Sequence, residues 1–313
     1  MNIKYPLLLD GGLSNELESR GCDLNHKLWS ARLLDSDIRS IIQAHMAYLE
    51  AGAKCLITAS YQASIPGFMD YGFTKDEAEQ LILRSVWAAE EAIKESGNKE
   101  VYIAASIGPF GAYLGDGSEY HGNYGINDAT LKQFHEERIQ LLGLSNADFF
   151  ACETIPSLQE AKVLCEILND ANKQAWVSFS CKDEIHLNDG TPIRECAKLF
   201  AKHPKVFAIG VNCTKPEYIS SLIQELRAVP HSKKIVVYPN SGETYEANTK
   251  SWSGEATCVL LSKEWLELGA DIIGGCCRVG PEHIKSIASV LDQNSQMGRS
   301  EKKYYLYSGV IMN

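Results

Sequence analysis

The chain alternates short apolar runs with longer amphipathic stretches, and it does so eight times. Each run is about six to eight residues long and almost continuously apolar, as is typical of strands buried on both faces of a parallel sheet. We therefore predict eight buried strands. The runs are Leu7–Gly12, Cys55–Ser60, Val101–Gly108, Phe149–Thr154, Ala175–Cys181, Val206–Cys213, Lys234–Ser241 and Asp271–Cys277.

The stretches between these runs carry the signals of helices. Segment 37–51 places its isoleucines, Met46 and Leu49 on one side of a helix. Thr-Lys-Asp-Glu at 74–77 and Ser-Leu-Gln-Glu at 157–160 match the capping box, in which the first and last side chains each cap the other's backbone amide. Thr-Pro at 191–192 is typical of an N-cap followed by proline in the first helical position.

Later stretches predict further helices and two helix ends. The helices are expected over residues 216–228, 255–268 and 281–292. Gly52 and Gly269 each follow an amphipathic stretch, where helices commonly end on a glycine in the left-handed conformation.

Eight strand–helix units without a break in composition predict a single (β/α)8 barrel, a TIM barrel of the α/β class. We expect the barrel over residues 1–293 and a C-terminal tail over 294–313. The alternative is an open, doubly wound sheet. Its Gly-x-Gly-x-x-Gly fingerprint is missing after the first run, where Gly-Gly-Leu-Ser stands at 11–14.

Composition narrows the function. The chain has 313 residues, of which 45% are hydrophobic and 22% charged, an ordinary globular balance. Its net charge of −10 argues against nucleic acid as a partner, because phosphate binding needs a basic surface. The N-terminus lacks the apolar core of a secretory signal, and no apolar run approaches the ~20 residues that span a bilayer. We expect a cytoplasmic protein with no membrane partner.

In a (β/α)8 barrel the chemistry lies at the carboxyl ends of the strands. Acidic, amide, hydroxyl and thiol side chains end the predicted strands, and their convergence on one rim is a stronger signal than any single residue. The polar residues at these ends include Asp10, Ser60, Tyr61, Glu153, Cys213, Asn240, Cys276 and Cys277.

Three of the ten cysteines belong to this rim: Cys213 after the sixth strand, and Cys276 with Cys277 after the eighth. Three thiolates with one open position are typical of a catalytic zinc site, since structural sites use four ligands. Neighbouring strand residues point to opposite faces, so we expect Gly274-Gly275 to supply the backbone freedom that brings both thiols to one ion. Packing residues or a redox-active vicinal pair remain the alternatives.

An open zinc position suggests a thiol as the substrate. A free thiol with a pKa near ~8.5 is mostly protonated at neutral pH, whereas a coordinated thiol is deprotonated and becomes a nucleophile. The matching electrophile is a methyl group on a positively charged donor. The seven other cysteines are expected to be small buried hydrophobic residues.

The motifs Gly-Val-Asn-Cys at 210–213 and Gly-Gly-Cys-Cys-Arg at 274–278 resemble the homocysteine S-methyltransferase family, together with Asp-Gly-Gly at 10–12, Glu-Thr at 153–154 and Tyr-Pro-Asn-Ser-Gly-Glu at 238–243. The resemblance covers about residues 5–293. It implies a (β/α)8 barrel, Zn²⁺ on the three rim cysteines and homocysteine sulfur as the fourth ligand. It also implies that Asp10 and Glu153 lie in the homocysteine pocket, with Glu153 on the amino group, where a charge-assisted hydrogen bond is strong.

The branch that the chain resembles uses S-methylmethionine or S-adenosylmethionine as the methyl donor. Segments 58–63 and 238–243 carry this likeness, which implies substrate-binding roles for Ser60, Tyr61 and Asn240. A betaine-dependent enzyme is the alternative, although those relatives carry a longer C-terminal extension.

A segment rich in glycine, tyrosine and acid follows the third strand, at residues 111–120. Tyrosine rings attract cations, so we expect this segment to close as a lid over a sulfonium donor, with Tyr113 and Tyr120 on the donor side.

Two other classes of function remain to be weighed. A non-catalytic zinc or redox-sensing barrel would use the adjacent cysteines as a switch. A barrel lyase or aldolase would need a lysine at a strand end, and none of the eight runs ends in lysine. The expected partners are small molecules, and the oligomeric state is left open.

Overall fold

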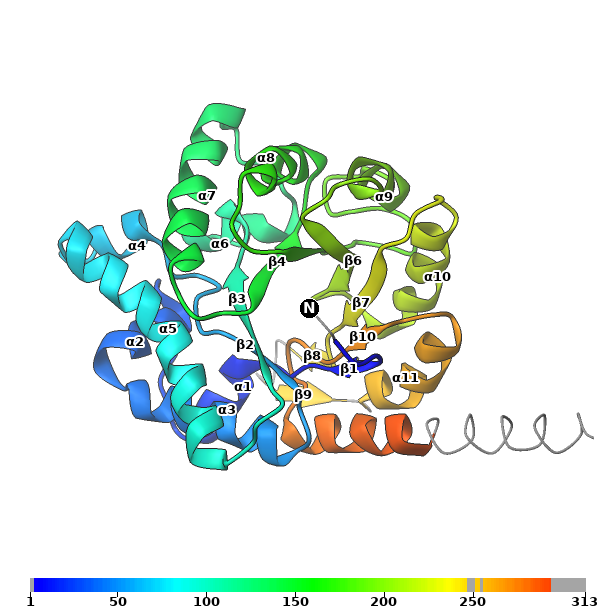
Figure 1. Ribbon diagram of the computed structural model, residues 1–313, viewed down its shortest axis with the longest axis horizontal. Coiled ribbons are helices and arrows are strands. Elements are labelled where there is room, and N and C mark those ends of the chain that lie inside the picture. Colours follow the sequence, from blue (N-terminus) through cyan, green and yellow to red (C-terminus); the bar gives the residue numbers. More distant parts are fainter. Residues whose placement is uncertain (1–2, 247–250, 254–255, 294–313) are drawn as a thin grey trace, which may run out of the picture.

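The computed structural model describes residues 3–246, 251–253 and 256–293. Eight parallel strands form one ring in the order β1-β10-β7-β6-β5-β4-β3-β2 (Figure 1). A parallel bridge between Leu9 and Cys55 joins β1 to β2 and closes the ring. The predicted (β/α)8 barrel is therefore confirmed. The strands are β1 Leu7–Leu8, β2 Cys55–Ile57, β3 Tyr102–Ile107, β4 Phe149–Ile155, β5 Ala175–Phe179, β6 Val206–Asn212, β7 Lys234–Tyr238 and β10 Ile272–Ile273.

Helices surround the ring and cover the outer face of the strands (Figure 1). They are α1 Leu13–Ser19, η1 Trp29–Arg32, α2 Leu33–Ser36, α3 Ile38–Glu50, α4 Ile65–Met69, α5 Lys75–Ser96, α6 Phe110–Leu114, η2 Ser118–Tyr120, α7 Asp128–Gly143, α8 Leu158–Asn169, α9 Ile193–Phe200, α10 Pro216–Arg227 and α11 Thr257–Glu267. A last helix runs over residues 281–293.

Two apolar layers hold the barrel together. The inner layer fills the ring itself and includes the large side chains of Phe149, Trp176 and Tyr238. The outer layer lies between strands and helices, where residues such as Ile209 and Trp265 are fully buried. Because inner and outer positions are both apolar, the strands appear in the sequence as continuous hydrophobic runs rather than alternating ones.

Several predicted helix ends are confirmed. Thr74 and Glu77 form the reciprocal capping box at the start of α5. Gly52 and Gly269 have φ angles of 106° and 98°, the left-handed region that glycine adopts without steric cost. Each follows a helix whose last carbonyls accept the backbone bonds of a Schellman motif, such as Ala270 N to Trp265 O at 2.9 Å.

Two predicted helix starts are wrong in detail. Ser157 caps α8 through the amide of Glu160, but the Glu160 side chain turns away from the cap and bonds to other elements. The proline predicted in the first helical position is instead the N-cap residue of α9, which begins at Ile193. Thr191 does not cap this helix, because its hydroxyl bonds to Asp189 at 3.1 Å.

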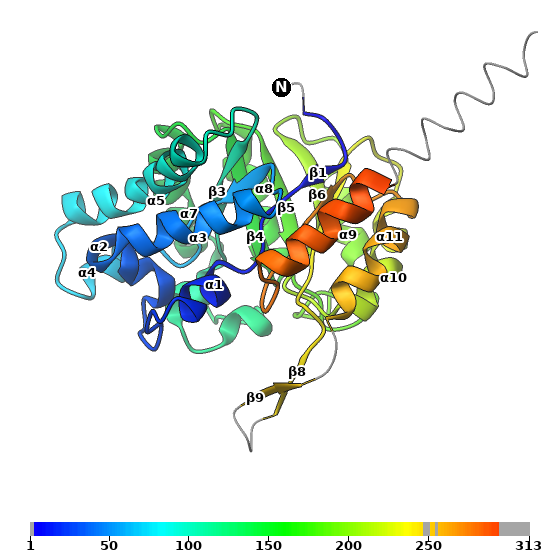
Figure 2. The same ribbon diagram turned by 90° about the horizontal axis from the view of Figure 1, so that it is seen from below.

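The segment 111–120, predicted to act as a lid, contains two short helical turns, α6 and η2. An antiparallel hairpin of β8 (Thr244–Glu246) and β9 (Ser251–Ser253) was not predicted and projects from the barrel (Figure 2). Residue 255 of the predicted helix 255–268 and the predicted tail 294–313 lie outside the described residues.

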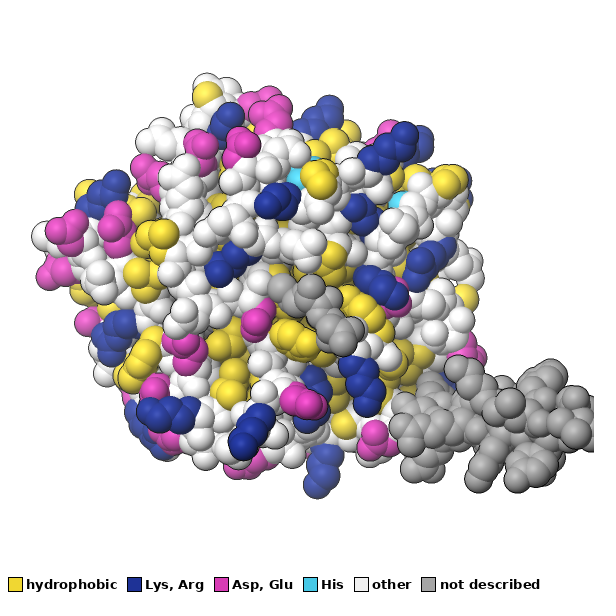
Figure 3. Space-filling model, in the orientation of Figure 1, with side chains coloured by type: hydrophobic (Ala, Val, Ile, Leu, Met, Phe, Trp, Pro, Cys, Tyr) yellow, Lys and Arg dark blue, Asp and Glu magenta, His cyan; other side chains and the backbone are white. Residues whose placement is uncertain are grey.

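The N-terminus and the β8–β9 hairpin lie on opposite sides of the barrel (Figure 2). Acidic and basic side chains are interspersed over the face that carries the N-terminus (Figure 3). Within the described ranges, no helix has the length and apolar character needed to cross a membrane.

Candidate active site

A pocket of about 370 Å³ opens at the carboxyl ends of the strands. This is the face of a (β/α)8 barrel at which catalytic residues are found. Residues from six of the predicted strand ends meet here, so the expected convergence is confirmed. The lining includes Gly12, Trp29, Tyr61, Glu119, Tyr120, Glu153, Cys213, Tyr238, Cys276 and Cys277.

The three rim cysteines form one cluster in the wall of this pocket. Their sulfur atoms all lie within 4.8 Å of one another. Cys277 Sγ is 3.8 Å from Cys213 Sγ and 4.0 Å from Cys276 Sγ. A metal with bonds of about 2.3 Å to tetrahedral thiolates would separate the sulfurs by roughly 3.8 Å. The cluster thus has the spacing of a three-thiolate metal site.

Backbone geometry brings the cysteines together. Cys213 follows β6 with a φ of 48°, a backbone conformation that residues other than glycine rarely adopt. Its amide donates to Tyr238 O at 3.3 Å, which ties it to the end of β7. Cys276 begins a turn closed by the amide of Val279 at 3.1 Å, and Arg278 within that turn has a φ of 65°.

The role predicted for Gly274-Gly275 needs correction. Neither glycine has a positive φ; the unusual dihedrals belong to Cys213 and Arg278. The two glycines are required for space, because a Cβ at 274 would lie 2.6 Å from Leu9 Cβ and one at 275 would lie 2.1 Å from a Val279 methyl. Close packing of the eighth strand end, rather than backbone freedom, explains this pair.

Glu153 reaches the pocket from a bulge in β4, where the register with β5 shifts. The next residue, Thr154, has a φ of 61°. Asn212 fixes this bulge: its Oδ1 accepts from Thr154 N at 2.7 Å, and its Nδ2 donates to Thr154 Oγ1 at 2.7 Å. Ser178 adds a further bond to Asn212 Oδ1 at 2.8 Å.

Burial raises the pKa of Glu153 to about 7, although hydrogen bonds from Ser106 and Tyr238 act in the opposite direction. Ser106 Oγ donates to Glu153 Oε1. Trp176 Nε1 donates to the Tyr238 hydroxyl at 3.0 Å from within the barrel. The carboxyl group is therefore buried with a few polar partners, a setting that favours binding of a cation.

Asp10 lies beneath the pocket and is 1% exposed. Its Oδ2 accepts from the amide of Ile57 at 2.9 Å, which joins the ends of the first two strands. Its Oδ1 has no hydrogen-bond partner among the described residues. Burial, and then the nearby Glu153, raise the pKa of Asp10 well above its usual value.

Aromatic side chains form the mouth of the pocket. The rings of Trp29 and Tyr61 lie edge to face with centroids 6.3 Å apart. Tyr120 is 56% exposed, and Glu119 beside it is half-buried. Burial raises the pKa of Glu119. An acid among aromatic rings is an arrangement that attracts cations.

Four predicted site residues do not line this pocket, and the first is Asp10, which lies beneath it rather than in its wall. Ser60 is fully buried and bonds to Ser106 O at 2.8 Å. Asn240 lines a neighbouring groove with Lys215 and Arg278. Tyr113 lies on the other side of α6, where its hydroxyl is 3.3 Å from Asp70 Oδ2.

Sequence reasoning missed several residues of the site. Trp29 and Glu119 lie outside the predicted strands, so strand-end analysis could not place them in the pocket. Asn212 belongs to the Asn-Cys motif, but its partner Thr154 is 58 residues away along the chain. A signal for Asn212 did exist, because a buried amide beside a strand end requires a hydrogen-bond partner.

The seven other cysteines are free thiols away from the cluster. Five are buried, and Cys22 and Cys165 are partly buried against the core. Their expected role as small hydrophobic residues is confirmed.

Comparison with known proteins agrees with this geometry. The profile of the family described as Homocysteine S-methyltransferase matches residues 7–291. Homocysteine S-methyltransferase YbgG of Bacillus subtilis is 47% identical over 91% of this chain and 94% of its own length. Homocysteine S-methyltransferase 4 of Zea mays is 45% identical over 90% of this chain and 88% of its own length.

A solved structure matches as well. The homocysteine methyltransferase MmuM from Escherichia coli, in a metallated form, superposes with a TM-score of 0.81 at 39% identity, covering 90% of this chain and 95% of that one. The profile covers nearly the whole barrel, including the three rim cysteines and Glu153. The chain therefore belongs to the homocysteine S-methyltransferase family, the enzymes that transfer a methyl group to the sulfur of homocysteine.

Proposed function

We propose that this chain binds zinc through Cys213, Cys276 and Cys277 and transfers a methyl group from S-methylmethionine, or S-adenosylmethionine, to the thiol of homocysteine. The observation that carries the proposal is the thiol cluster in the wall of a pocket that also contains a buried acid and an aromatic mouth. The thiol cluster would hold the zinc that binds the homocysteine sulfur, the buried acid would bind the ammonium group of homocysteine, and the aromatic mouth would bind the sulfonium of the donor.

The donor set fits zinc. Three thiols are soft ligands, and their spacing leaves one side of the cluster facing the pocket. Three thiolates within 4.8 Å of one another repel, so a cation among them is needed to hold all three in the charged form. Zinc bound here would supply a site at which the homocysteine thiol loses its proton and becomes a nucleophile.

Glu153 is our candidate for binding the homocysteine ammonium group. Its carboxyl lines the same pocket as the three cysteines, so one small amino acid can reach both. An ammonium ion favours the charged form of a buried carboxyl. Asp10 would support this site from below by accepting a hydrogen bond from the amide of Ile57.

The mouth of the pocket favours a cationic donor. Trp29, Tyr61 and Tyr120 offer ring faces, and Glu119 offers a negative charge. Cation–π attraction is worth roughly 0.5–2 kcal/mol for each well-placed ring. When a sulfonium meets a thiolate, the two charges cancel as the methyl group moves, so a water-poor pocket favours transfer. Homocysteine and S-methylmethionine would then give two molecules of methionine.

One assay tests the proposal. Zinc-loaded protein is incubated with homocysteine and, in parallel, S-methylmethionine, S-adenosylmethionine or betaine, and methionine is quantified. We expect methionine with a sulfonium donor. Methionine from betaine alone would overturn the donor assignment, and undiminished activity in the absence of any metal would overturn the zinc assignment.

A further inference from the structure

A buried arginine contacts the backbone of Tyr61, one of the aromatic residues at the mouth of the pocket. Arg138 of α7 is 2% exposed, and its guanidinium lies 4.7 Å above the ring of Phe134. Its Nη2 donates to Gly108 O at 2.5 Å, and its Nη1 lies 3.4 Å from both Tyr61 O and Ala63 O. One side chain thus reaches the segments that follow β2 and β3.

A second set of bonds continues from this arginine. Arg138 Nη2 lies 3.3 Å from His135 Nδ1, and His135 Nε2 lies 2.7 Å from Glu160 Oε1. Burial lowers the pKa of His135, so the ring is neutral, accepts from Arg138 and donates to Glu160. His135 and Glu160 are both fully buried.

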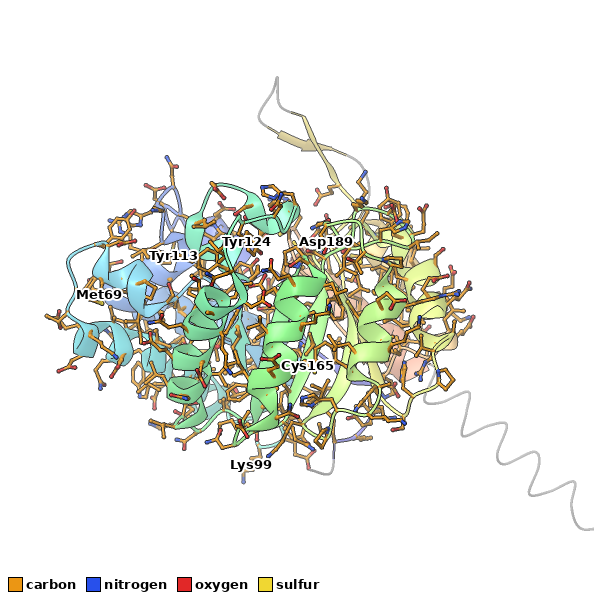
Figure 4. All side chains as sticks on the ribbon, turned by 90° about the horizontal axis from the view of Figure 1, so that it is seen from above. Met69, Lys99, Tyr113, Tyr124, Cys165 and Asp189 are labelled. Carbon is orange, nitrogen blue, oxygen red and sulfur yellow. The ribbon has the colours of Figure 1, made fainter. Side chains whose placement is uncertain are left out.

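Glu160 carries the network to the segment that borders the pocket. Its Oε1 accepts from the amide of Phe110 at 2.7 Å, and its Oε2 accepts from the Tyr124 hydroxyl at 2.8 Å. Phe110 is the first residue of α6, which precedes Tyr120. Figure 4 places Tyr124 near the ends of α7 and α8, on the side from which the hairpin projects.

The contacts above the network are tight. A Cβ at Gly108 would lie 2.4 Å from Tyr61 O and 2.8 Å from the Tyr61 ring, so this ring rests directly on the backbone that Arg138 holds. A Cβ at Gly111 would lie 2.3 Å from Glu119 N, so α6 and η2 are packed just as closely. A small shift at Arg138 would therefore move the pocket wall.

We propose that Arg138 is a positioning residue for the methyl donor: with His135 and Glu160 it fixes the backbone that carries Tyr61 and the segment 110–120, and it touches neither substrate. This proposal rests on the proposed function, in which the donor binds at that wall. A buried charge is costly unless its partners are well placed, so the network is expected to have one favoured geometry.

The test compares the kinetics of Arg138→Lys with those of the parent enzyme. An ammonium group cannot span three carbonyls as a planar guanidinium does. We expect the KM for S-methylmethionine to rise about tenfold, while the KM for homocysteine and the zinc content stay unchanged. A purely structural role would lower thermal stability without separating the two KM values.

A double-mutant cycle tests whether Arg138 acts through Tyr61. In a Tyr61→Ala background, the same lysine substitution should change the donor KM much less than it does in the parent. Equal effects in both backgrounds would overturn the proposal. Arg194→Lys is the matched control, since Arg194 is an exposed residue of α9 that pairs with Glu225.

Two further measurements keep the proposal testable if Arg138→Lys folds poorly or if the protein does not use a sulfonium donor. Glu160→Gln keeps the size of the side chain, and we expect a smaller rise in the same KM. Hydrogen exchange over residues 108–120 needs no donor and should quicken in both network variants but not in the control. If the parent makes no methionine from a sulfonium, the proposed function fails; if exchange is unchanged in both variants, the positioning role fails.

Discussion

The side-chain amide of Asn212 makes two hydrogen bonds to Thr154. Its Oδ1 accepts from the Thr154 backbone amide at 2.7 Å, and its Nδ2 donates to the Thr154 hydroxyl at 2.7 Å. Thr154 has a φ of 61°, so these bonds hold a residue in a conformation that it would not adopt alone. The same bulge carries Glu153 into the pocket. The Asn-Cys motif thus serves two purposes: Cys213 joins the thiol cluster, and Asn212 shapes the acid side of the pocket.

This relationship predicts the effect of Asn212→Ala. The substitution leaves the Thr154 amide buried without its partner, which costs about 1–3 kcal/mol in the free energy of unfolding. We also expect a higher KM for homocysteine, because Glu153 loses its fixed position. Ser178→Ala is the comparison variant, since it removes one bond to Asn212 Oδ1 and one to the Tyr238 hydroxyl but leaves both bonds between Asn212 and Thr154 in place. Urea unfolding and steady-state kinetics provide the readouts, and an unchanged homocysteine KM would argue against the positioning role.

Glu153→Gln tests the ammonium assignment. A hydrogen bond to a charged group contributes about 1.5–3 kcal/mol, so the kcat/KM for homocysteine should fall roughly 10- to 150-fold. The donor KM should change little. Glu195→Gln, on the exposed side of α9, is the control. A change in the donor KM alone would show that Glu153 contacts the methyl donor and not homocysteine.

The two tyrosines of the 111–120 segment should now behave differently. Tyr120 lines the mouth of the pocket, whereas Tyr113 bonds to Asp70 outside it. Tyr120→Ala should raise the donor KM about 2- to 30-fold, as expected from the loss of one cation–π contact. Tyr113→Phe should leave it unchanged. Equal effects from both substitutions would contradict the placement of the donor at this mouth.

His45 predicts a pH dependence of stability that is independent of the active site. It is fully buried in α3, neither ring nitrogen has a hydrogen-bond partner among the described residues, and burial lowers its pKa to about 4. The unfolded chain, with a histidine pKa near ~6.5, binds more protons between these two values. Stability therefore falls as the pH drops below about 6.5.

Replacing His45 with Leu should remove this contribution. Between pH 7.5 and 5 the parent should lose about 2 kcal/mol more than the variant in the free energy of urea unfolding. His121→Gln serves as the exposed control. Parallel pH profiles for the parent and His45→Leu would show that the buried ring does not titrate as described.

The sequence was sufficient for the barrel and for the thiol cluster because both depend on local patterns. Continuous apolar runs mark strands buried on both faces, and the rim is defined by where those runs end. Cys213 and Cys277 could be paired in advance because strand ends converge in any such barrel.

Long-range hydrogen bonds explain most of what could not be predicted. Glu160 has the spacing of a capping residue, yet it bonds to the amide of Phe110, 50 residues earlier in the chain. Local spacing carries no information about such a partner. Tyr113 was misplaced for a related reason: α6 turns its side chain away from the pocket, and a segment rich in glycine gave no sign of a helix.

The zinc content and the activity of one preparation together test whether Cys213, Cys276 and Cys277 hold a catalytic zinc ion. The purified protein should carry about one zinc per chain, lose zinc and methionine formation together on chelation, and regain both when zinc is restored. Cys213→Ala should lose both, whereas Cys22→Ser, at a thiol outside the cluster, should retain both. Full activity in metal-free protein, or in Cys213→Ala, would show that methyl transfer does not depend on a zinc ion at this cluster.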